Sequence, residues 1–133
     1  MRNYNLIATS LEQSRQLMDA GLSLSTADMT YNKFKACKDD YYFLSVDDKT
    51  NDESGLVDVV PAWSLSALIE LMPKIKTEYG IIRPKMVKEE TSVLQYRFYY
   101  ETLYFSEICE TAVDAAVDMV LWLIREGFLI YKK

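Results

Sequence analysis

The chain contains no histidine, and this absence removes several classes of active site. Histidine is the general base of Ser-His-Asp and Cys-His catalysis and a frequent zinc ligand. The four glycines are all isolated, so no glycine-rich loop is present to hold a phosphate group. Acid–base or metal chemistry would have to come from carboxylates, tyrosines or lysines. We therefore expect a protein that is not an enzyme and that carries no cofactor.

Cysteine is also scarce, and the two present, Cys37 and Cys109, lie far apart and outside any Cys-x-x-Cys pair. We expect two buried thiols rather than a disulfide. The longest apolar run, Met119–Ile124, is too short to span a bilayer. The segment Met1–Ala8 is interrupted by polar residues, unlike a signal peptide. A cytoplasmic protein without membrane contact is expected.

The composition is typical of one globular domain, which we expect to cover residues 1–133. Half of the residues are hydrophobic and 26% are charged. A net charge of −5 argues against a general surface for nucleic acid or anionic lipid. The bases are concentrated between residues 74 and 97, however, which leaves room for a local basic face. The candidates for a nucleic-acid-binding face are Lys74, Lys76, Arg83, Lys85, Lys88 and Arg97.

The acidic segment Asp47–Gly55 is a candidate for a divalent cation, but its spacing fails. Counting from Asp48, the sixth residue is Glu53 and the twelfth is Val59, whereas an EF-hand needs glycine and glutamate there. A solvated loop without metal is predicted. Asp114 and Asp118 share a helical face and could work as an acid–base pair. The favoured interpretation is that Asp114 serves the helix N-terminus, whereas Asp118 faces water or pairs with a base.

Three helices are predicted, each from a polar N-cap followed by apolar residues at the helical period. Gln13 completes a capping box with Ser10, and Asp114 lies in the first turn of the last helix. The helices begin after Ser10, Ser64 and Thr111, and they end near Gly21, Leu71 and Gly127.

Strands are predicted where aromatic and β-branched residues gather between turn residues. The first two are expected to form a hairpin, and the last three an antiparallel meander whose first strand, containing Pro84, is an edge or bulged strand. The segments are Asp40–Val46, Leu56–Val60, Ile81–Lys88, Ser92–Tyr100 and Thr102–Ile108, with a further short strand or a packed tail at Phe128–Tyr131. The segment Leu22–Lys38 has no clear assignment.

These elements predict an α+β fold with two layers. A twisted antiparallel sheet of about four or five strands would be packed by three helices, in the order α-β-β-α-β-β-β-α.

The tyrosine-rich strands are the most unusual feature. Arg97 and Tyr99 alternate with Tyr96, Phe98 and Tyr100, so the two sets point to opposite faces of a sheet. Cross-strand packing, a protein interface and base stacking all fit such a face. No ribonucleoprotein motif supports base stacking.

Two further aromatic residues extend this set. Tyr104 and Phe105 point to opposite faces of the next strand. Trp122 lies almost opposite the apolar stripe of the last helix, so that helix is apolar nearly all round. Such a helix is buried on several sides or covered by another chain. The predicted interface residues are Arg97, Tyr99, Tyr104 and Trp122.

Three parts of the chain carry a resemblance: Glu12–Leu17 leading to Gly21-Leu22 and Ser25–Met29; Pro61–Leu68; and Ala115–Ile124 with Gly127. Together they resemble a family of small proteins encoded on prophages and mobile elements of Bacteroides-like gut bacteria. The resemblance implies that origin and an α+β fold, and it implies no activity and no functional residues. The tyrosine strands and the acidic segment lie outside it.

Two likenesses concern topology alone. Helix, three strands and helix between Ser64 and Gly127 is similar to a double-stranded-RNA-binding domain. Those domains grip phosphates with lysines where this chain has Glu107 and Glu110, so that activity is not implied. The strands followed by Glu110–Ala116 also resemble HicB-type antitoxins, which neutralise a small RNase by covering it.

The sequence thus predicts a non-catalytic accessory protein of a prophage or mobile element. It would act by protein–protein interaction, with an unidentified partner or a second copy. The alternative is a nucleic-acid-binding or HicB-like antitoxin module.

Overall fold

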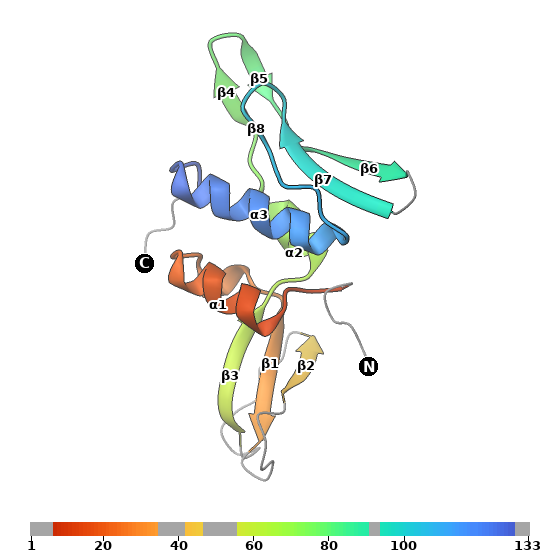
Figure 1. Cartoon of the computed structure of the whole chain (residues 1–133). Helices are drawn as coiled ribbons and strands as arrows, with labels where there is room; N and C mark the ends of the chain where they lie inside the picture. Colours follow the sequence, from red (N-terminus) through yellow and green to blue (C-terminus); the bar gives the residue numbers. More distant parts are fainter. Residues whose placement is uncertain (1–6, 35–41, 47–55, 91–93, 130–133) are drawn as a thin grey trace.

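A computed structural model describes residues 7–34, 42–46, 56–90 and 94–129. These residues form three α-helices, a short 3₁₀ turn and eight strands in antiparallel sheets. The helices lie in the middle of the molecule, with the N-terminal strands on one side of them and the C-terminal strands on the other (Figure 1). The acidic segment, Cys37 and the end of the predicted C-terminal strand fall outside the described residues. The α+β class is confirmed, but the strands form three separate sheets instead of one.

The N-terminal sheet has the order β2-β1-β3. Its strands are β1 (Met29–Phe34), β2 (Phe43–Val46) and β3 (Leu56–Ala62). The predicted hairpin between the second and third of these is wrong, because β1 lies between them and pairs with both. Tyr31 on β1 is buried beside Val60 and Ala62, and its hydroxyl donates to the Thr9 carbonyl at 2.8 Å. The segment left unassigned from sequence therefore supplies the central strand.

Helix α1 (Leu11–Asp19) begins and ends as predicted. The Gln13 amide donates to the Ser10 hydroxyl at 3.1 Å, and the Ser10 amide donates to the Gln13 side chain at 3.0 Å. Beyond the helix, Gly21 has a φ of +100°, a conformation that residues with a Cβ rarely adopt. The 3₁₀ turn η2 (Leu24–Thr26) then leads the chain into β1.

Helices α2 (Leu65–Leu71) and α3 (Ala112–Arg125) form the centre of the core. Their N-caps are Ser64 and Thr111, as predicted, and each hydroxyl accepts a backbone N–H at 3.1 Å. Helix α3 is buried along most of its length, which agrees with its nearly continuous apolar surface. None of the helices in the described part of the chain is long and apolar enough to cross a membrane.

The C-terminal strands form a small hairpin and a three-stranded sheet. They are β4 (Ile75–Thr77), β5 (Gly80–Ile82), β6 (Lys85–Glu90), β7 (Leu94–Tyr100) and β8 (Tyr104–Phe105). The predicted strand Ile81–Lys88 is divided near Pro84, which lacks the N–H that a ladder needs, so β5 pairs with β4 and β6 pairs with β7. The antiparallel order β6-β7-β8 agrees with the predicted meander, although β8 is shorter than Thr102–Ile108.

A buried group of polar contacts joins the two halves at Trp63. The Trp63 indole N–H donates to Thr26 Oγ1 at 2.8 Å, and its backbone N–H donates to Thr9 Oγ1 at 3.1 Å. Next to it, the Asp28 carboxylate accepts from both the backbone N–H and the hydroxyl of Ser64. Trp63 itself is fully buried. These contacts fix the start of α2 against the segment that leads into β1 and against the segment before α1.

Candidate interaction surface

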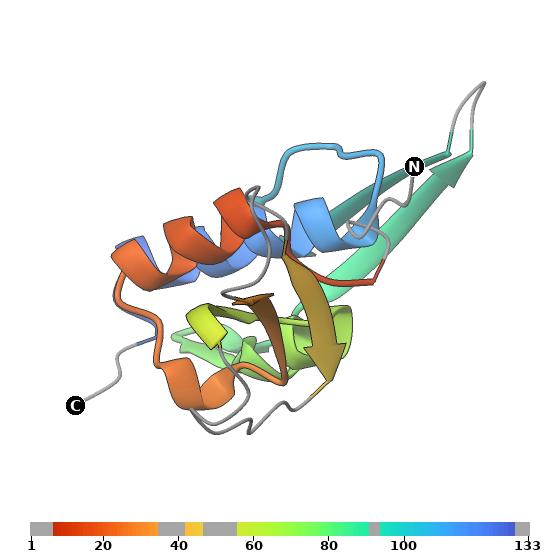
Figure 2. The ribbon, with the colours of Figure 1, turned by 90° about the horizontal axis from the view of Figure 1, so that it is seen from below.

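The sheet of β6, β7 and β8 has one face on the core and one face away from it. Phe98 and Tyr100 on β7 are buried against α3, and the Tyr100 hydroxyl donates to the Pro73 carbonyl at 2.7 Å. Burial raises the pKa of Tyr100, so the phenol stays protonated. Because Phe98 and Tyr100 face the core whereas Arg97 and Tyr99 do not, the alternation predicted for β7 is confirmed. The ribbon of β6 and β7 extends beyond the helices (Figure 2).

The other face, here called the outer face, carries an ordered aromatic group. It comprises Lys85, Val87, Arg97, Tyr99 and Phe105, which the strand register places on one side. The rings of Tyr99 and Phe105 stack with centroids 5.1 Å apart and planes 3° from parallel. The Arg97 guanidinium carbon lies 5.7 Å from the centre of the Phe105 ring.

Arg97 is also held by the backbone, since its Nε–H donates to the Ser106 carbonyl at 3.0 Å. The Ser106 hydroxyl in turn accepts the Phe98 amide N–H at 3.0 Å. These bonds fix the guanidinium beside the ring before any partner arrives. Phe105 nevertheless remains 49% exposed.

Tyr104 and Trp122, which the sequence also placed at the interface, contact each other inside the subunit. Their rings stack with centroids 4.6 Å apart, and Trp122 also contacts Tyr100 and Phe128. Trp122 is only 9% exposed, so little of it is left for a partner to cover. Burial, assisted by the hydrogen bond to Asp118, raises the pKa of Tyr104. We therefore leave both residues out of the contact surface.

Asp114 and Asp118 do not form an acid–base pair, because each carboxylate bonds to a different segment. Asp114 Oδ1 accepts from the Gln13 side-chain amide at 2.7 Å, which ties α3 to α1. Asp118 Oδ2 accepts from the Tyr104 hydroxyl at 3.0 Å and the Glu107 backbone N–H at 2.9 Å. The predicted role of Asp114 in the first turn of α3 is confirmed. Asp118 pairs with a phenol and a backbone amide rather than with a base.

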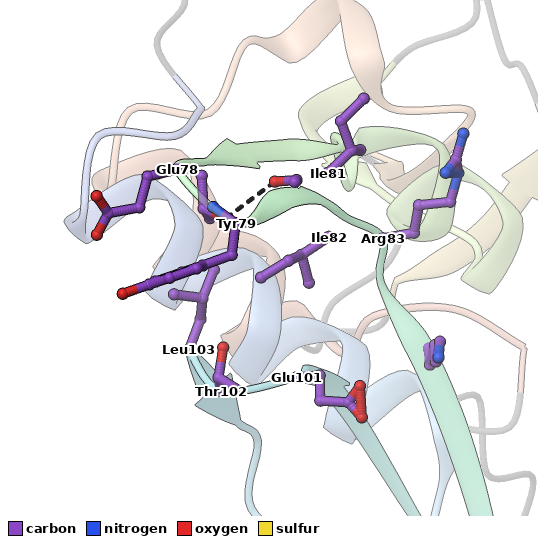
Figure 3. A pocket seen from close by; sticks show the side chains of 11 residues that line it. Glu78, Tyr79, Ile81, Ile82, Arg83, Glu101, Thr102 and Leu103 are labelled. Carbon is purple, nitrogen blue, oxygen red and sulfur yellow. Dashed lines mark hydrogen bonds between the residues drawn. The ribbon is translucent and has the colours of Figure 1, made fainter.

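Beyond the end of β7, a pocket of about 980 Å³ opens between two turns. One wall is the hairpin of β4 and β5, and the other is the turn from Glu101 to Leu103. Figure 3 shows Ile82 and Leu103 pointing into this space, with Tyr79 at its mouth and Ile81 on the other side of the hairpin. We call this the hairpin pocket. Lys85 lines it and is paired with Tyr99, so the pocket and the outer face are continuous.

Tyr79 is 92% exposed although the hairpin that carries it is anchored in the core. Ile75, in β4, is buried in the core and pairs with Ile82, which packs partly against it. In the turn, the Thr77 hydroxyl donates to the Gly80 carbonyl at 2.9 Å and accepts the Tyr79 amide N–H at 3.1 Å. The exposed ring is therefore presented by a fixed backbone.

Sequence reasoning missed Tyr79, Leu103 and Phe105 as members of the surface. The Glu-Tyr-Gly turn around Tyr79 is the one local signal for an exposed ring, because Gly80, with a φ of +129°, marks a tight turn. Phe105 was placed on the face opposite Tyr104, but the sequence does not reveal which of the two faces α3 covers.

The candidate bases do not share one face in the described structure. Lys85 and Arg97 are on the outer face, whereas Lys88 pairs with Tyr96 on the opposite side of the sheet. Lys76 lies in β4, where it pairs with Ile81 of β5, and it is not among the residues that line the pocket. Arg83 lines the hairpin pocket beside Lys85, whereas Lys74 is exposed on the segment that precedes β4. The six bases are therefore divided, with Arg83, Lys85 and Arg97 on one continuous surface and the other three away from it.

Within the described ranges, no group of three or more Cys, Asp or Glu side chains could hold a metal ion. Cys109 is a free thiol beside acidic side chains. Burial, with Asp114, Asp118 and Glu107 nearby, raises its pKa to about 11, so it is a poor nucleophile at neutral pH. In comparisons with protein-family models, curated proteins and solved structures, none matched the chain.

Proposed function

We propose that this chain is a non-catalytic protein that binds another protein chain, and that the outer face and the hairpin pocket form its contact surface. The observation that carries the proposal is the rigid group of Arg97, Tyr99 and Phe105 on a sheet face that leaves Phe105 half exposed. Tyrosine and arginine dominate the energetic centres of protein interfaces, because they combine large buried area with directional polar groups.

Cross-strand packing alone explains why the rings of Tyr99 and Phe105 stack, but it does not explain why apolar side chains near them are exposed. Single apolar residues on a surface are ordinary, whereas a cluster indicates a contact site. Tyr79 and Leu103 are exposed on the two walls of the hairpin pocket, and Phe105 is exposed on the adjoining outer face. Several other large exposed apolar residues lie elsewhere: Leu24, Val46 and Ile69 are on η2, β2 and α2, and Met86 is on the opposite side of the sheet.

The group is also preorganised, which favours binding. Ordering a flexible side chain on association costs roughly 0.5–1.5 kcal/mol. Arg97 is already bonded to the Ser106 carbonyl, and the Phe105 ring is already stacked on Tyr99. When a partner covers these side chains, this chain therefore loses little additional side-chain entropy.

The resemblance of the helical segments to mobile-element proteins supports an accessory role in a prophage or mobile element as part of the same proposal. Such a role needs no chemistry beyond recognition of a partner.

Affinity capture with the full chain tests the proposal. Wild-type protein, Phe105→Ala and the control Val46→Ala are immobilised and exposed to the same source-cell extract. We expect a partner that Phe105→Ala loses and Val46→Ala retains, since Val46 is exposed on the distant β2 strand. Capture that is equal for all three proteins, or absent for all three while light scattering reports a strict monomer, would refute the proposal.

A further inference from the structure

The hairpin pocket and Tyr79 together form a patch that contains both a cavity and a projecting ring. Tyr79 stands at the mouth of the pocket, whose apolar lining includes Ile82 and Leu103 (Figure 3). A partner of unrelated sequence would have to supply both a group that fills the cavity and a cavity that receives the ring. A second copy of the same chain supplies both with one patch, because a twofold interface sets each residue of a patch against another residue of that patch.

The charges around the pocket are also self-complementary. Glu78 and Glu101 contribute two acids, and Arg83 and Lys85 contribute two bases. All four side chains are exposed, and none forms an ion pair with another residue of the described chain. A rim of one sign would repel its own copy, whereas this rim can pair its acids with the bases of a twofold mate.

We propose that the hairpin pocket is the interface of a twofold homodimer, in which Tyr79 of each copy enters the pocket of the other. This inference rests on the proposed function and names the partner for the pocket as a second copy. A tyrosine buries roughly 150–250 Å². A standard interface needs about 800 Å² from each partner, so two exchanged tyrosines with their immediate neighbours form a small one. We expect a reversible dimer that dissociates on dilution.

Sedimentation equilibrium of the full chain, over a range from low micromolar to several hundred micromolar, is the first test. The wild type should show a monomer–dimer equilibrium. Tyr79→Ala should raise the dimer dissociation constant by about tenfold or more. Val46→Ala should leave it unchanged. A strict monomer at every concentration, or a dimer that persists in Tyr79→Ala, would overturn the inference.

A charge exchange gives a test that does not depend on the removal of apolar area. One variant carries Glu78→Lys and Glu101→Lys, and the other carries Arg83→Glu and Lys85→Glu. Each rim then has one sign, so each variant alone should be monomeric, whereas the equimolar mixture should form a heterodimer. Failure of the mixture to associate, with circular dichroism showing both variants folded, would contradict the twofold contact.

The results also separate this inference from the proposed function. A monomeric wild type that still captures a partner in a Phe105-dependent manner rejects the homodimer and retains the interaction protein. A monomer that captures nothing rejects both.

Discussion

One side chain, that of Asp118, holds the segment between β8 and α3 in position. Asp118 accepts two hydrogen bonds, one from the Tyr104 hydroxyl and one from the Glu107 backbone, so one carboxylate ties both residues to α3. The Tyr104 ring is thereby fixed against Trp122, while the next residue, Phe105, is turned to the outer face. The orientation of the exposed surface thus depends on a carboxylate that lies behind it.

Removal of that carboxylate should destabilise the fold. Asp118→Ala removes both bonds, and we expect the free energy of unfolding to fall by about 1–2 kcal/mol, because water can replace the carboxylate only at the exposed Glu107 amide. Asp118→Asn retains one acceptor oxygen and should cost less, as should Tyr104→Phe, which deletes only the hydroxyl. Urea denaturation followed by fluorescence measures all three. A change under about 0.5 kcal/mol for Asp118→Ala, the range of ordinary surface substitutions, would disprove the role given to Asp118.

The thiol of Cys109 provides a prediction about pH. Because its pKa is raised from the usual 9.0 to about 11, the folded state favours the protonated thiol. Its contribution to stability is therefore complete below pH 9 and is lost as the pH rises through 11. In a Cys37→Ser background, the rate of alkylation by iodoacetamide should rise by roughly tenfold or more between pH 9 and pH 11, because the thiolate is scarce at pH 9. A rise of only about twofold over this range, as a thiol with the usual pKa would give, would contradict the prediction.

At the scale of elements, sequence signals succeeded where the determining contacts are local. Ser10, Ser64 and Thr111 were identified as N-caps because a cap bonds to an amide three residues later. Strand β1 was missed because its partners, β2 and β3, lie in separate later segments and its own composition is mixed. The sequence indicates one continuous strand around Pro84 where the structure has two, because it does not show that β5 turns back to pair with β4.

The candidate surface could be predicted only in part for the same reason. Alternation along β7 placed Arg97 and Tyr99 together correctly, because a strand has a fixed period of two. Whether Trp122 is buried or exposed depends on which side of α3 packs against the sheet, and tertiary packing decides this. Tyr79 gave almost no signal, since its exposure results from the way Ile75 roots the hairpin in the core.

Substitutions on the two sides of the sheet should differ sharply in their effect on stability. Trp122→Ala removes a buried ring that contacts three other aromatic residues, and we expect a loss of roughly 3–5 kcal/mol. Phe105→Ala removes one exposed stack, at a cost of about 1 kcal/mol. Thermal and urea unfolding of both variants give the comparison. Similar losses for the two substitutions would mean that the outer face is part of the core.

For the whole molecule, hydrogen bonds between segments that are distant in sequence build the scaffold. Gln13 bonds to Asp114, Thr26 to Trp63 and Asp28 to Ser64. The outer face and the hairpin pocket belong to the strands between α2 and α3. The contact surface therefore lies on strands outside the segments that these bonds join.

If another protein chain covers the outer face and the hairpin pocket, photo-crosslinking in the source cells should capture it. A benzophenone amino acid replaces Tyr79 or Phe105, and Val46 is the matched control. We expect crosslinked adducts from Tyr79 and Phe105, with either a second copy or another protein, and none from Val46. Illumination that yields no adduct from either position, with the variant chains folded and abundant, would contradict that expectation.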